Sequence, residues 1–116
     1  RLRMALANSL NIPAVKAMEH VGVENFVEQM SRLGVTSFDD PSRFGLAMAL
    51  GSNEVRLLEL TGAYNALRNA GRYVDPVAVI KVTNSRGEVL ERWQPARGRP
   101  ALGPQSEQLA YLITSI

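Results

Sequence analysis

The fold is decided around one stretch, residues 3–15, which read RMALANSLNIPAV. Before its turn, leucines recur at every fourth position and predict a helix over residues 1–10. Asn11 breaks that pattern, and Pro13 is of a type favoured in the first turn of a helix. The stretch therefore predicts two helices joined by a short turn that carries Ser9.

Working outward, apolar residues return at helical spacing in several runs, most of them ended by glycine. The predicted helices cover residues 13–21, 24–33, a stretch from the turn at 51–54 to about 69, and 105–116, with one or two further turns over 44–50. Residues 51–54 are expected to supply the turn and N-cap of the third of these helices. One core is expected to unite the apolar stripes on both sides of that turn, including Phe26, Met30, Leu57, Leu60 and Tyr64.

The periodicity changes after Pro76. Residues 77–83 alternate and are β-branched, a turn signal follows at 84–87, and residues 88–93 form a second alternating run. This pattern predicts a β-hairpin, and helices with one antiparallel hairpin make an α+β class. Because an isolated hairpin is marginal in water, we expect it to pack on another part of the molecule.

Composition removes several function classes. The chain has 116 residues, a formal net charge of +2 and no cysteine, so disulfides, thiolate catalysis and cysteine-based zinc sites are excluded. His20 is the single histidine, which argues against a multi-histidine metal site. The charge is too small to indicate nucleic acid, and no apolar run reaches the roughly 20 residues of a membrane helix. Helical pattern at both ends predicts a piece of a longer protein.

On local chemistry alone, Ser9 and Asn11 read as a helix end. An asparagine before Ile-Pro can cap the following helix, and serine is common at such positions. No histidine or aspartate lies nearby in the sequence to build a Ser-His-Asp relay, and His20 is expected at the exposed end of the next helix. This interpretation assigns the pair a capping role and no catalytic one.

The surrounding sequence nevertheless resembles the penicillin-binding proteins, the serine transpeptidases that cross-link peptidoglycan. Residues 3–15 are similar to the S-x-N region of the bifunctional, class A members. Residues 46–55, LAMALGSNEV, resemble the family's A-L-G-x-x-E-V stretch, and residues 63–76 resemble its A-Y-x-x-x-A-N-x-G helix end. The similarity runs in the same order through nearly the whole chain.

The resemblance implies a mechanism in which a serine of an S-x-x-K motif attacks a D-Ala-D-Ala carbonyl and forms an acyl-enzyme. In the S-x-N element, Ser9 is then the hydroxyl that relays a proton and Asn11 the amide that orients the substrate and the lysine. Leu10 is expected to point away as a core residue.

Two of the three motifs are absent. No serine is followed by lysine three positions later, and Lys81 is followed by Val-Thr rather than Thr-Gly. The chain is therefore expected to hold one wall of the site and to be inactive in isolation. The resemblance implies part of the penicillin-recognising, β-lactamase-like fold and no cofactor. Its expected parts are a helical subdomain (1–75), a hairpin (76–93), a loop (94–104) and a helix (105–116).

The partners implied are peptidoglycan stem peptides, β-lactams and the remainder of the transpeptidase domain. The expected location is the extracytoplasmic face of the bacterial cell membrane, with the membrane reached through a segment outside this chain. Two alternatives stay open. One is a non-catalytic relative that binds peptidoglycan or a partner protein; the other is an unrelated helical interaction domain in which Ser9 and Asn11 only cap a helix.

Overall fold

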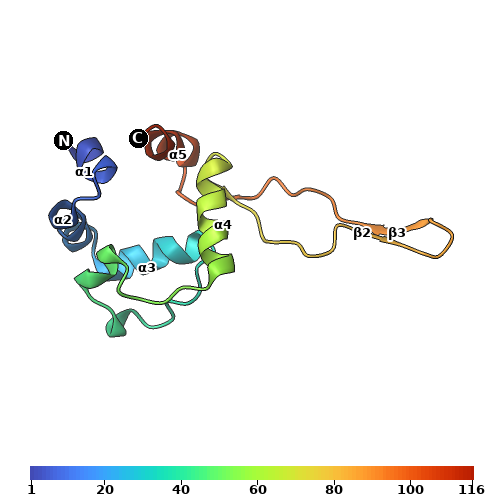
Figure 1. Cartoon of the computed structure of the whole chain (residues 1–116), viewed down its shortest axis with the longest axis horizontal. Coiled ribbons are helices and arrows are strands. Elements are labelled where there is room, and N and C mark those ends of the chain that lie inside the picture. Colours follow the sequence, from blue (N-terminus) through green and yellow to red (C-terminus); the bar gives the residue numbers. More distant parts are fainter.

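A computed structural model of residues 1–116 shows a ring of helices from which one long arm projects (Figure 1). The helices are α1 (Leu2–Ala7), α2 (Asn11–Val21), α3 (Val23–Arg32), α4 (Leu57–Arg68) and α5 (Ser106–Thr114), with short 3-10 helices η1 (Pro41–Arg43) and η2 (Leu46–Leu50). The strands are β1 (Arg72–Tyr73), β2 (Lys81–Thr83), β3 (Val89–Arg92) and β4 (Arg99–Pro100). Helices with small antiparallel sheets agree with the predicted α+β class.

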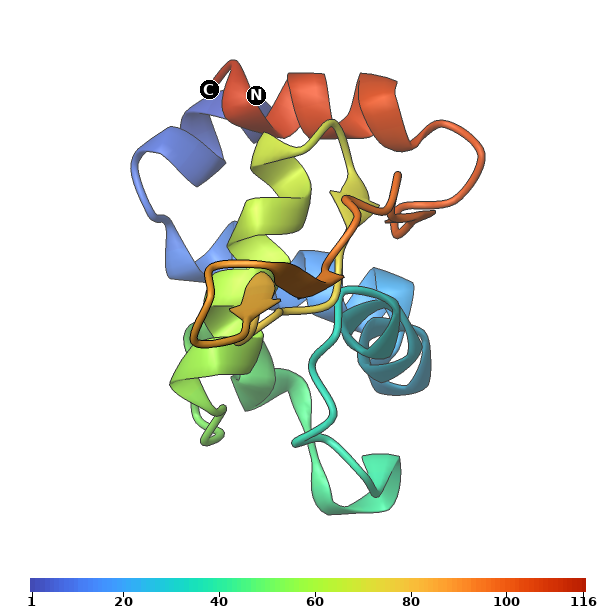
Figure 2. The ribbon, with the colours of Figure 1, turned by 90° about the vertical axis from the view of Figure 1, so that its right-hand side faces the viewer.

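The two ends of the chain meet on one side of the helical ring. Helices α1 and α5 both lie on that side, at the blue and red ends of the colour scale (Figure 2). The guanidinium of Arg3 donates to the hydroxyl of Ser115 at 3.1 Å and joins them. Helix α4 stands between α5 and α3, and none of the helices is long and apolar enough to cross a membrane.

Two small cores replace the single core predicted from sequence. Met18, Val27 and Met48 join α2, α3 and η2, and partly buried aromatic rings pack on them. The second core contains Ala66, Tyr73 and Ala101 and joins α4 to the base of the arm. The prediction of one shared core is therefore wrong.

Helix α4 explains the failure of that prediction. Its inward residues are small, Ala63 and Ala66, whereas Leu57 is 80% exposed and Tyr64 is 68% exposed. Of the large apolar stripe read from the sequence, Leu60 and Leu67 are half-buried, whereas Leu57, Leu58 and Tyr64 face solvent. Apolar periodicity indicates which face is available for packing, and a neighbouring element is needed to bury it.

The molecule is open for its size. Its accessible surface is 8841 Å², against about 6,200 Å² for a compact monomer of this mass. The radius of gyration is 17.6 Å, against about 13 Å expected for a compact domain of this length. Much apolar surface therefore remains available to a neighbour.

The arm, residues 74–98, leaves the body at Tyr73 and returns at Arg99 (Figure 1). Strands β1 and β4 pair at its base and β2 and β3 pair at its tip, both antiparallel. The predicted hairpin is confirmed, with shorter strands. The expectation that it packs on another part of the molecule is wrong in this chain, since every residue of β2 and β3 is exposed.

Several predicted helix boundaries also differ from the structure, by one to three residues. Helix α4 begins at Leu57 rather than directly after the predicted cap at 51–54, with Arg56 at its N-cap and no side-chain cap. Gly51 adopts the left-handed region, and the chain from there to Arg56 is not helical. The first helix ends at Ala7 instead of continuing to residue 10.

Candidate functional site

The turn between α1 and α2 is a Schellman motif. The amide of Ser9 donates to the carbonyl of Leu6 at 3.0 Å, and the amide of Leu10 donates to the carbonyl of Ala5 at 3.0 Å. These two bonds satisfy carbonyls that the end of an α-helix leaves unpaired. The side chain of Asn8 adds a third bond, from Nδ2 to the carbonyl of Met4 at 2.8 Å. The backbone at Ser9 is thus held by its neighbours.

Ser9 occupies the position of this motif that usually belongs to glycine. Its φ is +53°, and it is one of two non-glycine residues in the left-handed region, the other being Ala70 at +52°. A side chain there costs roughly 1–2 kcal/mol because Cβ crowds the following carbonyl. Strained residues of this kind cluster at functional sites, which makes the turn at Ser9 a candidate site.

The capping interpretation of Asn11 is wrong. Leu10 is the N-cap of α2, no side chain caps this helix, and Asn11 is its first residue. Ser9 and Asn11 are exposed, and neither the hydroxyl of Ser9 nor the carboxamide of Asn11 makes a hydrogen bond within the chain. Leu10 is 51% exposed, so the prediction that it is a core residue is also wrong here.

Ser9 and Asn11 border the same hollow, of about 430 Å³, between α1, α2 and η2. Its other walls are mostly apolar and include Leu6, Ala14 and Leu50. A second open hollow, again of about 430 Å³, lies beside the turn and is also bordered by both residues. The structure therefore brings together the two residues that the sequence singled out.

The apolar hollow contains no group that could take a proton from Ser9. None of its lining residues is lysine, histidine, aspartate or glutamate. His20 lies in the exposed last turn of α2, as predicted from the sequence. Without a base the Ser9 hydroxyl is not an activated nucleophile. It can still accept and donate hydrogen bonds beside an amide that does the same, which suits proton relay and substrate orientation.

A second polar cluster was not foreseen from the sequence. The carboxylate of Glu59 in α4 accepts bonds from the hydroxyl of Thr36 at 2.7 Å and from the hydroxyl and amide of Ser37. Arg56 lies 3.1 Å away on the same carboxylate. The Ser37 and Thr36 hydroxyls lower the pKa of Glu59 to about 2. Both carboxylate oxygens of Glu59 already have partners within the chain, so the cluster holds the loop after α3 against α4. We call this structural cluster the Glu59 clamp.

The adjoining surface is a polar hollow of about 370 Å³ bordered by Asp39 and Glu54. The only sign of this polar region in the sequence was the change from an apolar helix to the polar loop Thr-Ser-Phe-Asp-Asp at residues 36–40. No group of three or more histidine, cysteine or acidic residues is placed to hold a metal ion.

Acid should weaken the Glu59 clamp in a defined pH range. Because the folded-state pKa lies below the ordinary 4.5, the ionised carboxylate stabilises the fold above about pH 4.5, and that contribution is lost as the pH falls towards 2. We expect the melting temperatures of wild type and Glu59→Gln, in the whole protein, to differ at pH 6 and to converge by pH 2. Glu28→Gln, at an exposed ion pair with Arg32, is the control and should change little at either pH. Parallel curves for wild type and Glu59→Gln would contradict the assignment.

Comparison with known proteins gives relatives over nearly the whole chain. Penicillin-binding protein 1A of Aquifex aeolicus is 37% identical over 94 residues, which is 81% of this chain and 12% of that protein. Penicillin-binding protein 4 of Bacillus subtilis is 30% identical over 99% of this chain and 19% of its own length. Penicillin-binding protein 1A of Pseudomonas aeruginosa is 29% identical over 94% of this chain and 12% of its own length.

No protein-family model matches the chain. The chain spans between 12% and 19% of the length of these three relatives. The matches to the Pseudomonas aeruginosa and Bacillus subtilis proteins cover 94% and 99% of this chain, so they include the turn that carries Ser9 and Asn11. All three relatives are penicillin-binding proteins, and they match 81–99% of this chain. The chain therefore belongs to the penicillin-binding protein family and corresponds to one segment of these longer proteins.

Proposed function

We propose that this chain forms one wall of a D,D-transpeptidase site that cross-links peptidoglycan stem peptides and reacts with β-lactams. The observation that carries the proposal is the turn at Ser9. A hydroxyl held in strained backbone and an amide at Asn11, both without partners, border one hollow that has no base of its own. Such a pair assists a reaction whose nucleophile comes from elsewhere.

In this proposal the nucleophile is the serine of an S-x-x-K motif outside these residues. Its oxygen forms a bond to the carbonyl carbon of the penultimate D-alanine, and the peptide C–N bond breaks to release the terminal D-alanine. The proton lost by the nucleophile ends on the leaving amine. The Ser9 hydroxyl passes it on by accepting one proton and donating its own. With a β-lactam, the bond that breaks is the ring amide.

Asn11 has the second role. Its carboxamide has a donor end and an acceptor end, so it can hold the substrate amide with one and the motif lysine with the other. The amide lies in the first turn of α2, where the helix fixes its backbone. Orientation of this kind lowers the barrier because less freedom is lost when the reacting groups meet.

The remainder of the transpeptidase domain is the proposed neighbour of the exposed apolar faces. Helix α5 exposes Leu109, Leu112 and Ile113, and α4 exposes Leu57 and Leu58. Exposed large apolar side chains that gather on one surface usually mark an interface. The proposed location is the outer face of the bacterial cell membrane, where peptidoglycan is assembled.

Covalent labelling by a fluorescent penicillin tests the proposal. The whole protein that carries this segment should be labelled, and the isolated 116 residues should not, because loss of the nucleophile removes the covalent route. The gene should encode S-x-x-K before Arg1 and K-T-G after Ile116. A whole protein that lacks the motif serine and stays unlabelled would instead support a non-catalytic relative that binds peptidoglycan or a partner.

A further inference from the structure

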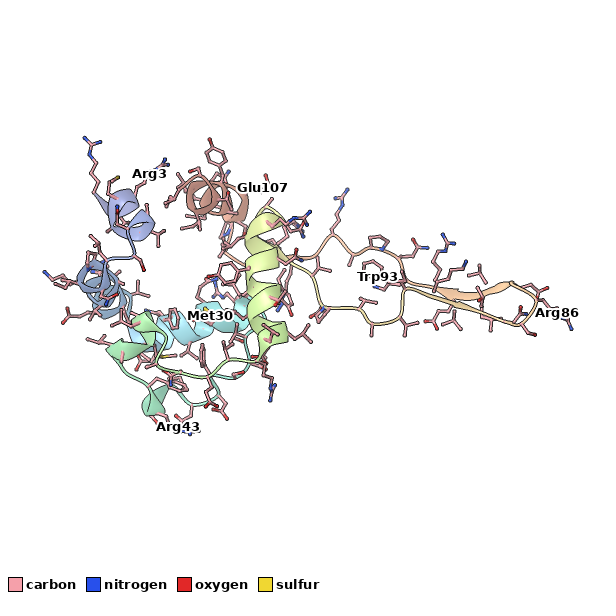
Figure 3. All side chains as sticks on the ribbon, viewed as in Figure 1. Arg3, Met30, Arg43, Arg86, Trp93 and Glu107 are labelled. Atoms are coloured by element: carbon pink, nitrogen blue, oxygen red, sulfur yellow. The ribbon has the colours of Figure 1, made fainter.

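The end of α1 is closed by hydrogen bonds that come only from the helix and from the turn that follows it. Helix α1, on which Arg3 is labelled in Figure 3, lies at one edge of the helical ring, and the turn with Ser9 comes directly after it. The helix has only six residues and no side-chain cap at its N-terminus. Because so short a helix is marginal by itself, each bond at its end helps to fix the turn.

Asn8 supplies the only side-chain hydrogen bond of this turn. Its Nδ2 donates to the carbonyl of Met4 at 2.8 Å, and its backbone amide donates to the same oxygen at 3.1 Å. The carboxamide therefore ties the residue before Ser9 back to the preceding turn of the helix. Strained backbone persists only where its surroundings hold it firmly, and Ser9 has φ +53°. Asn8 thus adds to what the backbone bonds alone can hold.

Asn8 itself lies outside both hollows that Ser9 borders. The residues that line them include Ser9, Leu10 and Asn11, but not Asn8. An effect of Asn8 on a molecule bound there therefore has to pass through the backbone of the turn. Asn11 depends less on this turn, because it is the first residue of α2, whose Met18 is buried in the core shared with α3 and η2. Ser9 has no comparable support.

We propose that Asn8 is a positioning residue for Ser9, with its carboxamide fixing the left-handed turn so that the Ser9 hydroxyl keeps one direction. This role rests on the proposed transpeptidase function, in which that hydroxyl relays a proton. Proton transfer requires donor and acceptor within hydrogen-bond reach, so a hydroxyl that wanders with a loosened turn is in place for less of the time. Asn8 neither contacts the substrate nor exchanges a proton with it.

The chain contains a matched control turn at the end of α4. Asn69 precedes Ala70, whose φ of +52° is nearly that of Ser9, so an asparagine again stands before a left-handed residue other than glycine. The carboxamide of Asn69 donates forward to the carbonyl of Arg72 at 3.1 Å and not back to its helix. Asn69→Ala therefore removes the same group from the same kind of turn, away from Ser9.

Acylation of the whole protein by a fluorescent penicillin is the measurement. The dependence of labelling on penicillin concentration gives a binding constant and a maximal acylation rate. We expect Asn8→Ala and the isosteric Asn8→Asp, which has no donor at neutral pH, to lower the maximal rate about tenfold and to change the binding constant less than about twofold. Asn69→Ala should leave both unchanged.

Asn8→Thr is the rescue variant. A threonine hydroxyl can donate to the carbonyl four positions earlier in a helix, as Thr61 does to Leu57 at 2.7 Å in α4. It should therefore restore the bond to Met4 and bring the maximal rate to within about threefold of wild type. A rate for Asn8→Thr as low as that of Asn8→Ala would overturn the proposal.

Ser9→Ala is the background that separates positioning from a general effect on the fold. Because the positioned hydroxyl is already gone, adding Asn8→Ala to Ser9→Ala should slow acylation by less than about twofold further. A merely structural role would slow both backgrounds alike. A further loss of about tenfold in the Ser9→Ala background would therefore overturn the proposal.

The positioning role and the proposed function fail in different ways. If Ser9→Ala slows acylation and Asn8→Ala does not, the positioning role is wrong and the proposed function stands. If Ser9→Ala is acylated at the wild-type rate, the relay role is wrong and the positioning role falls with it. Weaker binding without a lower maximal rate in Asn8→Ala, or equal slowing by Asn69→Ala, overturns the positioning role alone.

Discussion

Replacing Ser9 by alanine in the whole protein is expected to slow acylation by a fluorescent penicillin by about 10²–10⁴-fold, the range found when proton transfer in a transition state loses its group. Alanine removes the hydroxyl and leaves the backbone as it is, because Ala70 of this same chain occupies the left-handed region. The rate of labelling under excess penicillin is the measurement. Ser52→Ala, at an exposed turn, is the control and should leave the rate unchanged.

Ser9→Gly tests the same assignment from the side of stability. Glycine removes the crowding of Cβ at φ +53°, which stabilises the folded state, but it also makes the unfolded chain more flexible, which favours unfolding. We expect the free energy of unfolding to rise by up to about 1 kcal/mol. Acylation should fall as it does for Ser9→Ala. Ala70→Gly relieves a similar conformation at the end of α4 and should stabilise without loss of labelling. Labelling of Ser9→Gly at the wild-type rate would rule out the relay role.

Gly34→Ala is expected to be the most destabilising of the single substitutions considered, by about 2–5 kcal/mol. Gly34 has φ +86°, and a Cβ built there would lie 2.2 Å from Cζ of Tyr73. That ring is buried in the second core, and the guanidinium of Arg99 stacks over it in a cation–π contact, 4.5 Å from the ring centroid. Moving the ring would therefore disturb the base of the arm. The melting temperature of the domain that carries this segment is the measurement.

Gly51→Ala is the matched control for that prediction. Gly51 has φ +81°, close to that of Gly34, but a Cβ there would meet no atom within 4 Å. It should cost only the backbone strain, about 1–2 kcal/mol. If the two variants melted at the same temperature, packing of Tyr73 against Gly34 would not be a determinant of stability.

Local elements were predictable because local physics controls them. Glycines marked where α2 and α3 end, apolar spacing marked α3, and β-branched alternation marked the ribbon. The start of α4 was missed because the Ser-Asn-Glu segment after Gly51 has the composition of a cap, whereas Arg56 is the N-cap and no side chain caps that helix. Capping composition shows what a residue can do, and the backbone geometry decides whether it does so.

For the candidate site too, some features could be predicted from the sequence and others could not. The pair Ser9 and Asn11, and its order relative to the other landmarks, could be read from the sequence. The absence of capping bonds and the left-handed backbone at Ser9 could not, because both depend on how the end of α1 is closed. The Glu59 clamp was equally invisible, since its donors come from a loop 22 and 23 positions away.

By itself the sequence determined the helical and hairpin segments, the family resemblance and the two polar residues of the turn, since each depends on neighbouring residues or on their order. Tertiary structure alone decided which apolar stripes are buried, that the ribbon stands free, and that Ser9 and Asn11 share one hollow. The physical reason is that burial and strain depend on a second surface. For the ribbon and for the exposed side chains of α4 and α5, such as Leu57 and Leu112, no such surface lies within these 116 residues.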